Sequence, residues 1–544
     1  MRNHYGRSLS GRVLAALGAL CVFGAAHRAI AATVCVNQSG SSGCQTTIGK
    51  AIATAASGDT IQVAAGTYKE TVTIKTPVSL IGAGSGSTII DATGLANGIV
   101  IDGTGINAFG NVVVSGFTVE NANQQGILVE NASNVTIWGN QVLNNDRALT
   151  TSATGQASCP GLPSALQSGE NFDCGEGVNL TGVDHSVVSN NVIQNNSGGI
   201  LLSDDIGPTF GNLVSGNLVS NNLEECGITL ASHSGKGVYN NTVTGNQVSN
   251  NGTKLGFTGA GVGLFAPGPG DKTYGNLILN NTLTGNGHPG VTIHNHAAPP
   301  GAPSVDLNDN VIIGNTIANN AADTEDAVTP GTTGINIFSN APITGTVISQ
   351  NTINQEELGV VFNAPGGQVS AALNNFFTSV GIQNLGSGTI TGTQNWWGCT
   401  GGPNTQGCAL SRGAGITSAP FLTAAFNNGQ LPAAPSSVTP PPPSGSGVTI
   451  VITGPGGATS STNTFQVFSN FVTLDASKST SSNTGPLTYS WAIAPGSPTG
   501  GGIVGANTAT PTFQLTSPQT YQYILTVTDA TGAKATATVT VQYI

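Results

Sequence analysis

Charged and aromatic residues are scarce in this sequence. Only 7% of the 544 residues are Asp, Glu, Lys or Arg, and only 5% are Phe, Trp or Tyr. Lys and Arg together number 14 against 25 Asp and Glu, so the net charge is −11 at pH 7. Nucleic-acid binders need a basic surface to neutralise phosphates, and a chain this acidic does not offer one. The composition therefore excludes a nucleic-acid partner.

Long apolar runs are missing as well, with one exception at the N-terminus. Three arginines precede an apolar run over residues 13–26, and Ala29-Ile-Ala31 supplies the small residues of a cleavage site. His27 and Arg28 end the run well short of a membrane span. We therefore predict a signal peptide at residues 1–31 and a secreted or cell-surface protein without a transmembrane segment. Cleavage would leave 10 Lys and Arg against 25 Asp and Glu, a net charge of −15.

Seven cysteines would remain after cleavage, and six of them form close pairs in the sequence. Their proximity predicts three local disulfides in an oxidising compartment, although spacing alone does not fix the connectivity. The pairs are Cys35/Cys44, Cys159/Cys174 and Cys399/Cys408. Cys226 has no close partner and abuts an apolar segment, so we interpret it as a small buried residue rather than a nucleophile.

A short phrase returns throughout the middle of the chain: a glycine followed by an apolar, a variable and an apolar residue. A second phrase begins and ends with asparagine and precedes the first, as in Asn191-Val-Ile-Gln-Asn195. Successive phrase glycines lie 22 residues apart at the closest, which is typical of a solenoid. The phrase glycines are Gly126, Gly177, Gly199, Gly227, Gly261, Gly290, Gly334 and Gly359, and Gly381 begins a last, partial copy.

The phrases are too short for helices, and their apolar and variable residues alternate as in a strand with one buried face. Two or three such strands per coil would stack at about 4.8 Å into a parallel β-helix. A leucine-rich repeat would need a regular leucine ladder and a helical return segment, and the sequence has neither. The recurring asparagines predict a hydrogen-bonded internal ladder, and the Asn and Gly at strand ends predict left-handed turns.

Both ends of this region resemble a known family. Gly58-Asp-Thr-Ile-Gln-Val-Ala-Ala-Gly-Thr-Tyr68 and Val78-Ser-Leu-Ile-Gly-Ala-Gly84 resemble the opening of secreted right-handed parallel β-helix proteins of the pectate-lyase-like superfamily. Asn395-Trp-Trp-Gly-Cys399 resembles their closing segment. The resemblance covers about residues 33–425 and implies the fold. It does not specify an activity, because the superfamily holds lyases, hydrolases, epimerases and adhesins.

The first part of this region is expected to close the solenoid. Ile48 and Ile52 lie at helical spacing, and a short amphipathic helix there would cover the open end of the first coil. We therefore predict an N-terminal cap over residues 32–70 and the β-helix over residues 71–425.

The C-terminal part differs in composition and pattern. Residues 426–447 are rich in Pro, Gly and Ser and predict a linker, and residues 448–544 contain short period-two strands typical of a small β-sandwich with Trp491 in its core. Val472-Thr-Leu-Asp-Ala-Ser477 and Tyr521-Gln-Tyr-Ile-Leu-Thr-Val-Thr-Asp529 resemble the PKD (polycystic kidney disease) family of immunoglobulin-like domains. After the tryptophan this chain lacks the family's usual Asp-Phe-Gly-Asp-Gly-like stretch. We expect an accessory module here rather than catalysis.

The repeat register gathers acids and histidines at one edge of the predicted β-helix. Counting from each phrase glycine, the residues at +1 and +3 should face the core and the residue at +2 should point outward. Asp204 and Asp205 lie just past the strand in one coil, and His233 occupies the same place in the next coil. His294 and His296 follow the strand two coils further on. These five residues are the candidate catalytic residues.

Two interpretations of this cluster remain open. In the first, Asp204 and Asp205 with His233 transfer protons during polysaccharide hydrolysis, or the cluster holds a divalent cation such as calcium. In the second, these residues only cap turns, and the chain is a non-catalytic rod that contacts carbohydrate or cells. His185 and His288 are expected to be solvated turn residues. In either case we expect a polysaccharide or cell-surface glycan as the partner and a monomeric protein.

The motifs of related enzymes are largely missing. Only four basic residues lie between residues 80 and 410, which disfavours a lyase with a basic proton abstractor. The Asp-Pro-His-Asp pattern of alginate epimerases is absent. Of the motifs typical of polygalacturonase-like hydrolases only Asp204-Asp205 matches, with Ser232-His-Ser234 as a partial substitute. Nucleotide-binding loops, zinc-ligand spacings and serine nucleophile elbows are not present either.

Overall fold

The fold was obtained as a computed structural model. It describes residues 31–426 and 448–543 apart from short internal gaps, which are 107–108, 148–149, 152–156, 159–174, 255–257, 296–303, 326, 455–459, 461, 468–470, 484, 495–496, 499–502 and 516–518. The predicted signal peptide up to residue 30, the pair Cys159/Cys174 and His296 lie outside the described residues.

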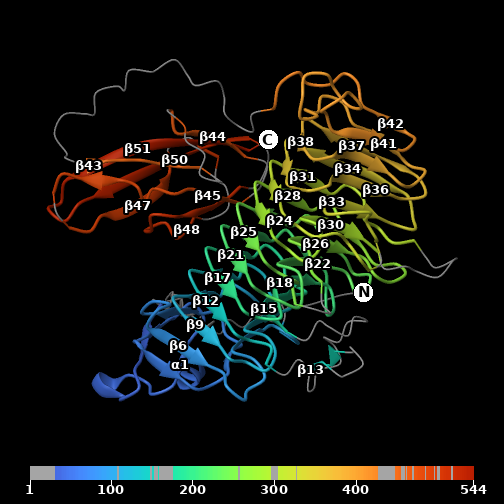
Figure 1. Cartoon of the computed structure of the whole chain (residues 1–544). Helices are drawn as coiled ribbons and strands as arrows, with labels where there is room; N and C mark the ends of the chain where they lie inside the picture. The colour runs from blue at the N-terminus through green and yellow to red at the C-terminus, as the bar shows by residue number, and fades with distance from the viewer. Residues whose placement is uncertain are drawn as a thin grey trace, which may run out of the picture.

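Residues 33–417 form a right-handed parallel β-helix with three long sheets, which we name A, B and C in the order in which each coil visits them (Figure 1). Sheet A has 14 strands: β1 (Thr33–Val36), β2 (Thr60–Val63), β5 (Ser79–Gly82), β8 (Val113–Ser115), β11 (Thr136–Trp138), β16 (Val187–Ser189), β20 (Leu213–Ser215), β24 (Thr242–Thr244), β28 (Leu277–Leu279), β31 (Val311–Ile313), β34 (Ile343–Ser349), β37 (Gly367–Ala372), β40 (Thr389–Thr391) and β42 (Ile416–Thr417).

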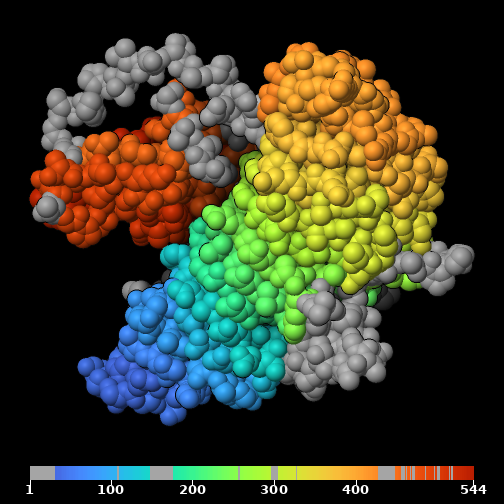
Figure 2. Space-filling view, viewed as in Figure 1, coloured from blue at the N-terminus to red at the C-terminus, as the bar shows by residue number. Residues whose placement is uncertain are grey.

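Sheets B and C follow the same stacking order. Sheet B has 11 strands: β3 (Gly66–Tyr68), β6 (Thr88–Asp91), β9 (Thr118–Glu120), β12 (Gln141–Leu143), β17 (Val192–Gln194), β21 (Leu218–Ser220), β25 (Gln247–Ser249), β29 (Thr282–Thr284), β32 (Thr316–Ala318), β35 (Thr352–Asn354) and β38 (Asn375–Phe377). Sheet C has 12 strands: β4 (Val72–Ile74), β7 (Ile99–Asp102), β10 (Ile127–Glu130), β15 (Glu176–Thr181), β18 (Gly198–Ser203), β22 (Ile228–Ala231), β26 (Val262–Phe265), β30 (Val291–His294), β33 (Thr333–Phe338), β36 (Leu358–Asn363), β39 (Val380–Asn384) and β41 (Leu410–Arg412). Figure 2 shows the coils following one another from blue to orange along the solenoid.

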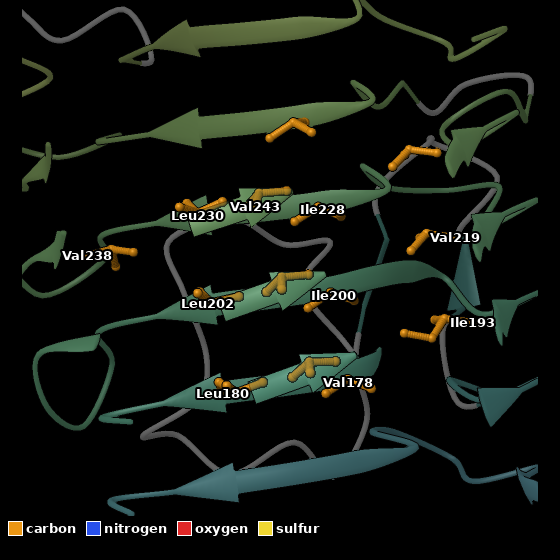
Figure 3. Packing of buried hydrophobic residues seen from close by; sticks show 14 of the residues in the cluster. Val178, Leu180, Ile193, Ile200, Leu202, Val219, Ile228, Leu230, Val238 and Val243 are labelled. Atoms are coloured by element: carbon orange, nitrogen blue, oxygen red, sulfur yellow. The ribbon is translucent and has the colours of Figure 1, made fainter. Parts of the chain in front are cut away.

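The core is a set of aliphatic columns along the solenoid axis. In sheet C the residues at +1 and +3 from each phrase glycine face inward, as predicted, and they stack in register, for example Ile200 on Ile228 and Leu202 on Leu230 (Figure 3). These side chains are fully buried. Each buried Ile, Leu or Val contributes about 1.5–3 kcal/mol of hydrophobic stabilisation, so the repeat itself stabilises the solenoid.

The phrase glycines are needed for close packing rather than for a left-handed turn. A Cβ on Gly199 would lie 2.5 Å from Cγ1 of Val219, and one on Gly227 would collide with Val248. Gly199 is the second residue of β18 and Gly227 directly precedes β22, and both lie against inward side chains of sheet B. The left-handed residues are others, such as Asn195 with φ 59° and Gly216 with φ 63°. The predicted turn conformations are therefore present, but not at the phrase glycines.

Asparagine ladders run along the inside of the turns, as predicted, and there are three of them rather than one. In each ladder the backbone N–H and the Nδ2 group of one asparagine donate to Oδ1 of the asparagine one coil later. Asn217, for example, donates to Asn246 at 2.9 and 3.0 Å, and its Nδ2 also donates to the carbonyl of Val188 at 2.9 Å. The ladders include Asn140–Asn395, Asn145–Asn320 and Asn212–Asn310. Their buried polar groups are thereby satisfied, which removes a large desolvation penalty.

The N-terminal end carries the predicted helix. Helix α1 (Ile48–Thr54) follows the short 3-10 helix η1 (Ser41–Gly43), and it buries Ile48 and Ile52 against the first coil. Both carboxylate oxygens of Glu70 accept hydrogen bonds from the first turn, from the N–H groups of Ile48 and Gly49. The disulfides Cys35–Cys44 and Cys399–Cys408 are formed, which confirms two of the three predicted pairs.

The C-terminal part is a β-sandwich, as predicted, with Trp491 buried against Phe513 at a centroid distance of 5.4 Å. The period-two pattern predicts six strands, at residues 448–452, 471–474, 487–491, 512–515, 521–528 and 535–541. It misses β44 (Thr464–Val467), β46 (Thr480–Ser481) and β48 (Ile503–Val504). The sheets are β44-β51-β50-β47, β45-β49-β48 and the pair β43-β46. Their strands are β43 (Val448–Thr449), β44 (Thr464–Val467), β45 (Phe471–Thr473), β46 (Thr480–Ser481), β47 (Thr488–Ile493), β48 (Ile503–Val504), β49 (Thr512–Gln514), β50 (Gln519–Thr528) and β51 (Lys534–Tyr543).

Candidate functional site

Three successive coils widen at the edge where sheet C connects to sheet A. Each of these connections adds a short strand, and the three strands pair in parallel as a small extra sheet. They are β19 (Thr209–Phe210), β23 (Val238–Tyr239) and β27 (Thr273–Tyr274). A separate pair of two-residue strands, β13 (Thr150–Thr151) and β14 (Ala157–Ser158), is antiparallel. The predicted acid and histidine cluster lies at the start of the widened connections.

Asp204 is a structural carboxylate. It is fully buried, and Oδ1 accepts from the N–H groups of His233 and Ser234 at 2.6 and 3.0 Å. Oδ2 accepts from the hydroxyl of Ser232 at 2.8 Å and from the N–H of Gly237 at 2.6 Å. Four donors from the next coil therefore surround one carboxylate, which holds that loop in shape. Both oxygens of this carboxylate are thus occupied by donors of the protein, and the catalytic role predicted for Asp204 stays a prediction.

The network continues into a third coil. The hydroxyl of Ser232, which donates to Asp204, accepts a hydrogen bond of 2.9 Å from the backbone N–H of Lys272. Asp271, the neighbouring residue, is 5% exposed and accepts from the N–H of Gly268 at 2.7 Å. Burial raises the pKa of Asp271, and the nearby charge of Asp204 raises it further. The sequence analysis missed Asp271, although it lies between sheets C and A like Asp204 and His233, one coil after His233.

Asp205 and His233 form the predicted contact across one coil. Nδ1 of His233 lies 3.1 Å from Oδ1 of Asp205, and the hydroxyl of Ser203 donates to Oδ2 at 2.6 Å. Burial alone would raise the pKa of Asp205, but the hydrogen bonds and charge of His233 outweigh it and lower that pKa. The side chains of His233 and Asp205 are only 4% and 8% exposed. The pair can orient an imidazole or hold a proton, but it lies beneath the surface.

His294 belongs to the outward row of sheet C rather than to this pair. It is the last residue of β30 and lies in register with Phe265, two strands from Ala231 of β22. Its ring meets the Phe265 ring edge-on at a centroid distance of 4.7 Å. The structure thus brings Asp204, Asp205 and His233 together and leaves His294 apart.

The same widened connections carry an aromatic stack, which the sequence analysis did not detect. Phe210, Tyr239 and Tyr274 come from the three added strands and lie in register. Their rings stack nearly parallel, with centroids 5.1 Å apart at both steps and interplanar angles of 4° and 10°. His185 closes one end with an edge contact of 5.4 Å to Phe210. All three aromatic side chains are partly exposed, so the stack presents ring edges to solvent.

The opposite edge of sheet C carries a second histidine–carboxylate pair. Nε2 of His288 lies 3.9 Å from Oδ1 of Asp323, and the two side chains are 7% and 1% exposed. The prediction that His288 is solvated was wrong, because Asp323 from the insertion after β32 lies beside it. His185, by contrast, has a side chain that is 41% exposed, as predicted. Cys226 is buried, and burial raises the pKa of its thiol, in agreement with a structural role.

The fold and its C-terminal sandwich define a right-handed parallel β-helix protein with a PKD domain. Residues 45–287 match the family model described as periplasmic copper-binding protein (NosD), and residues 462–542 match a family model of the PKD domain. These matches confirm both resemblances predicted from the sequence. No curated protein matches the chain.

Several solved structures are similar in part. The chain shares 15% identity with the Dettilon tailspike protein (gp208), covering 90% of this chain and 88% of that chain with a TM-score of 0.41. The chain is 15% identical to DFA-IIIase from Arthrobacter chlorophenolicus A6 without its lid. This match covers 67% of this chain and 89% of that chain, with a TM-score of 0.35. The chain is 19% identical to a nucleoside hydrolase-related protein from Saccharophagus degradans. This match covers 18% of this chain, with a TM-score of 0.16, and it spans 25% of that protein's length.

The described residues do not fit a copper centre. Among them no three His, Cys, Asp or Glu side chains converge where they could hold a metal ion. The only methionine of the sequence is Met1, so a thioether ligand is not at hand either. None of the helices in the described part has the length and hydropathy of a membrane span.

Proposed function

We propose that this protein binds polysaccharide, without cleaving it, at the widened edge of the β-helix. The observation that carries the proposal is the partly exposed stack of Phe210, Tyr239 and Tyr274. Parallel strands hold these rings in a fixed row, so binding needs little side-chain ordering. A tyrosine combines an apolar ring with a polar tip, which suits a sugar that offers both C–H groups and hydroxyls. Three aromatic groups in a row suit a polymer with repeated units.

Polar groups beside the stack support a sugar ligand. His185 lies at one end of the stack with an accessible side chain, and the exposed Lys272 directly precedes the strand that supplies Tyr274. These groups can donate hydrogen bonds to sugar hydroxyls or carboxylates. The location that accords with this function is outside the cytoplasm, at the cell surface or in the medium, where disulfides such as Cys35–Cys44 persist. A monomeric state stays a prediction.

A glycoside hydrolase is the second candidate, favoured by the hydrogen bond between Asp205 and His233. A carboxylate of lowered pKa that orients an imidazole is a usual arrangement for general acid–base catalysis. Both side chains are nearly buried, however, so a substrate could reach them only after a motion that exposes them. Binding therefore accords with the geometry as it stands, and catalysis requires an additional motion.

The test is retention and product release on a panel of plant, algal and bacterial polysaccharides, using the full chain without residues 1–31. We expect Tyr239→Ala/Tyr274→Ala to lose retention of the bound glycan. Phe377→Ala is the matched control, because Phe377 is an aromatic side chain with 48% exposure on sheet B. Unchanged retention by the double variant would refute the binding site. Product release that disappears in Asp205→Asn would establish the hydrolase instead.

A further inference from the structure

The outer face of the largest PKD sheet is rich in threonine and nearly free of charge. In β50 and β51 the alternate residues Tyr521, Tyr523, Val539 and Val541 point into the sandwich core. The other face therefore points to solvent. The register places eight threonines on that face: Thr464, Thr488, Thr520, Thr526, Thr528, Thr536, Thr538 and Thr540.

The threonines form an ordered array because the strands are in register. Thr526 lies opposite Thr536, and Thr528 lies opposite Thr488 on the other neighbouring strand. Same-face residues repeat at about 4.8 Å between strands and about 6.8 Å along a strand. Threonine is stiff at χ1, so each hydroxyl and methyl group keeps a nearly fixed position. The array thus offers hydroxyls and methyl groups at regular intervals.

The scarcity of charged residues on this face limits the kinds of ligand that can bind to it. Residues 448–544 contain only four charged residues, Asp475, Lys478, Asp529 and Lys534, and Lys534 alone lies on this face, at its edge. A charged polymer would find almost no counter-charge. A protein partner also fits poorly, because threonine and serine are under-represented among the residues that dominate protein interfaces.

We propose that this threonine face docks on the surface of an insoluble neutral polysaccharide. Such a surface repeats hydroxyl and C–H groups without charge, which is the chemistry that the face repeats. Hydroxyls of the array exchange hydrogen bonds with sugar hydroxyls, and the methyl groups pack on C–H groups. Little side-chain entropy is lost, because the threonines are already ordered. The surface is separate from the aromatic stack of the β-helix and does not depend on it.

The test is depletion of the full chain, without residues 1–31, from solution by microcrystalline cellulose and by insoluble chitin. We expect one of these to retain the protein and Thr536→Glu/Thr538→Glu to bind about tenfold more weakly or worse, equivalent to about 1.4 kcal/mol. Both threonines are exposed, so the charges do not enter the core. The thermal unfolding transition of the sandwich, compared between the variant and the parent chain, verifies that the variant sandwich is folded.

Two controls separate this proposal from the β-helix site. Thr480→Glu/Ser482→Glu places the same charges at the same spacing on exposed positions in and directly after β46, and it should bind as the parent chain does. Tyr239→Ala/Tyr274→Ala should leave this retention unchanged, even if it abolishes binding of a different glycan. The proposal is overturned if neither polysaccharide retains the parent chain, or if the threonine variant is retained equally well.

Discussion

Replacing Glu356 with glutamine should stabilise the β-helix above pH 7. Glu356 ends the second asparagine ladder, where its Oε1 accepts from the N–H and Nδ2 of Asn320 at 2.8 and 3.0 Å. The residue is only 5% exposed. Burial raises the pKa of Glu356 from 4.5 to about 7, although hydrogen bonds from Asn320 and Thr332 act in the opposite direction.

The raised pKa fixes the sign of the pH dependence. Below pH 4.5 the carboxyl is protonated in both the folded and the unfolded chain, so the native state carries no penalty from it. As the pH rises from 4.5 to about 7, the unfolded chain ionises first and stability is lost. The pKa difference of about 2.5, at 1.36 kcal/mol each, corresponds to about 3 kcal/mol at pH 8. Glutamine keeps the acceptor for Asn320 and removes the buried charge.

The assay is the urea midpoint of the β-helix transition, measured at pH 4 and pH 8 for the parent chain and Glu356→Gln. The variant should match the parent chain at pH 4 and exceed it by up to about 3 kcal/mol at pH 8. Glu357→Gln is the matched control, because the neighbouring Glu357 is exposed and its loss should change neither value. A Glu356→Gln effect of equal size at both pH values, or lower stability at pH 8, would refute the reasoning.

Three further substitutions test the architecture. Asp204→Asn should destabilise the protein by about 2–4 kcal/mol, because four donors lose a charged acceptor, and hydrogen exchange should accelerate at residues 232–237. Gly227→Ala should lower the free energy of unfolding by about 1–3 kcal/mol in thermal unfolding, because its Cβ would clash with the core residue Val248. Gly86→Ala is the control and should be neutral, because no atoms lie near the position of its Cβ. Asn246→Ala should cost about 1–3 kcal/mol by leaving buried ladder donors without an acceptor; an unchanged urea midpoint would contradict the ladder's role.

The sequence by itself determined the fold, because the fold is a local repeat. Period-two strands and recurring Asn and Gly residues restrict each coil in the same way, and identical coils can bury their apolar faces only by stacking. The same register predicted the contact between Asp205 and His233, since parallel stacking places equal positions one above the other. Trp491 as the core residue of the sandwich followed from its strand pattern for a similar reason.

The role of each site residue was decided by tertiary structure. Asp204 and Asp205 are neighbours of one type, yet the path of the next loop encloses the first with four donors and pairs the second with an imidazole. The aromatic stack escaped notice because Phe210, Tyr239 and Tyr274 lie in widened connections of unequal length. His288 is buried, and Asp323 from the insertion after β32 lies 3.9 Å from its ring. Loops outside the repeat have no periodic sequence pattern, so their contacts cannot be predicted from the sequence and are known only from the tertiary structure.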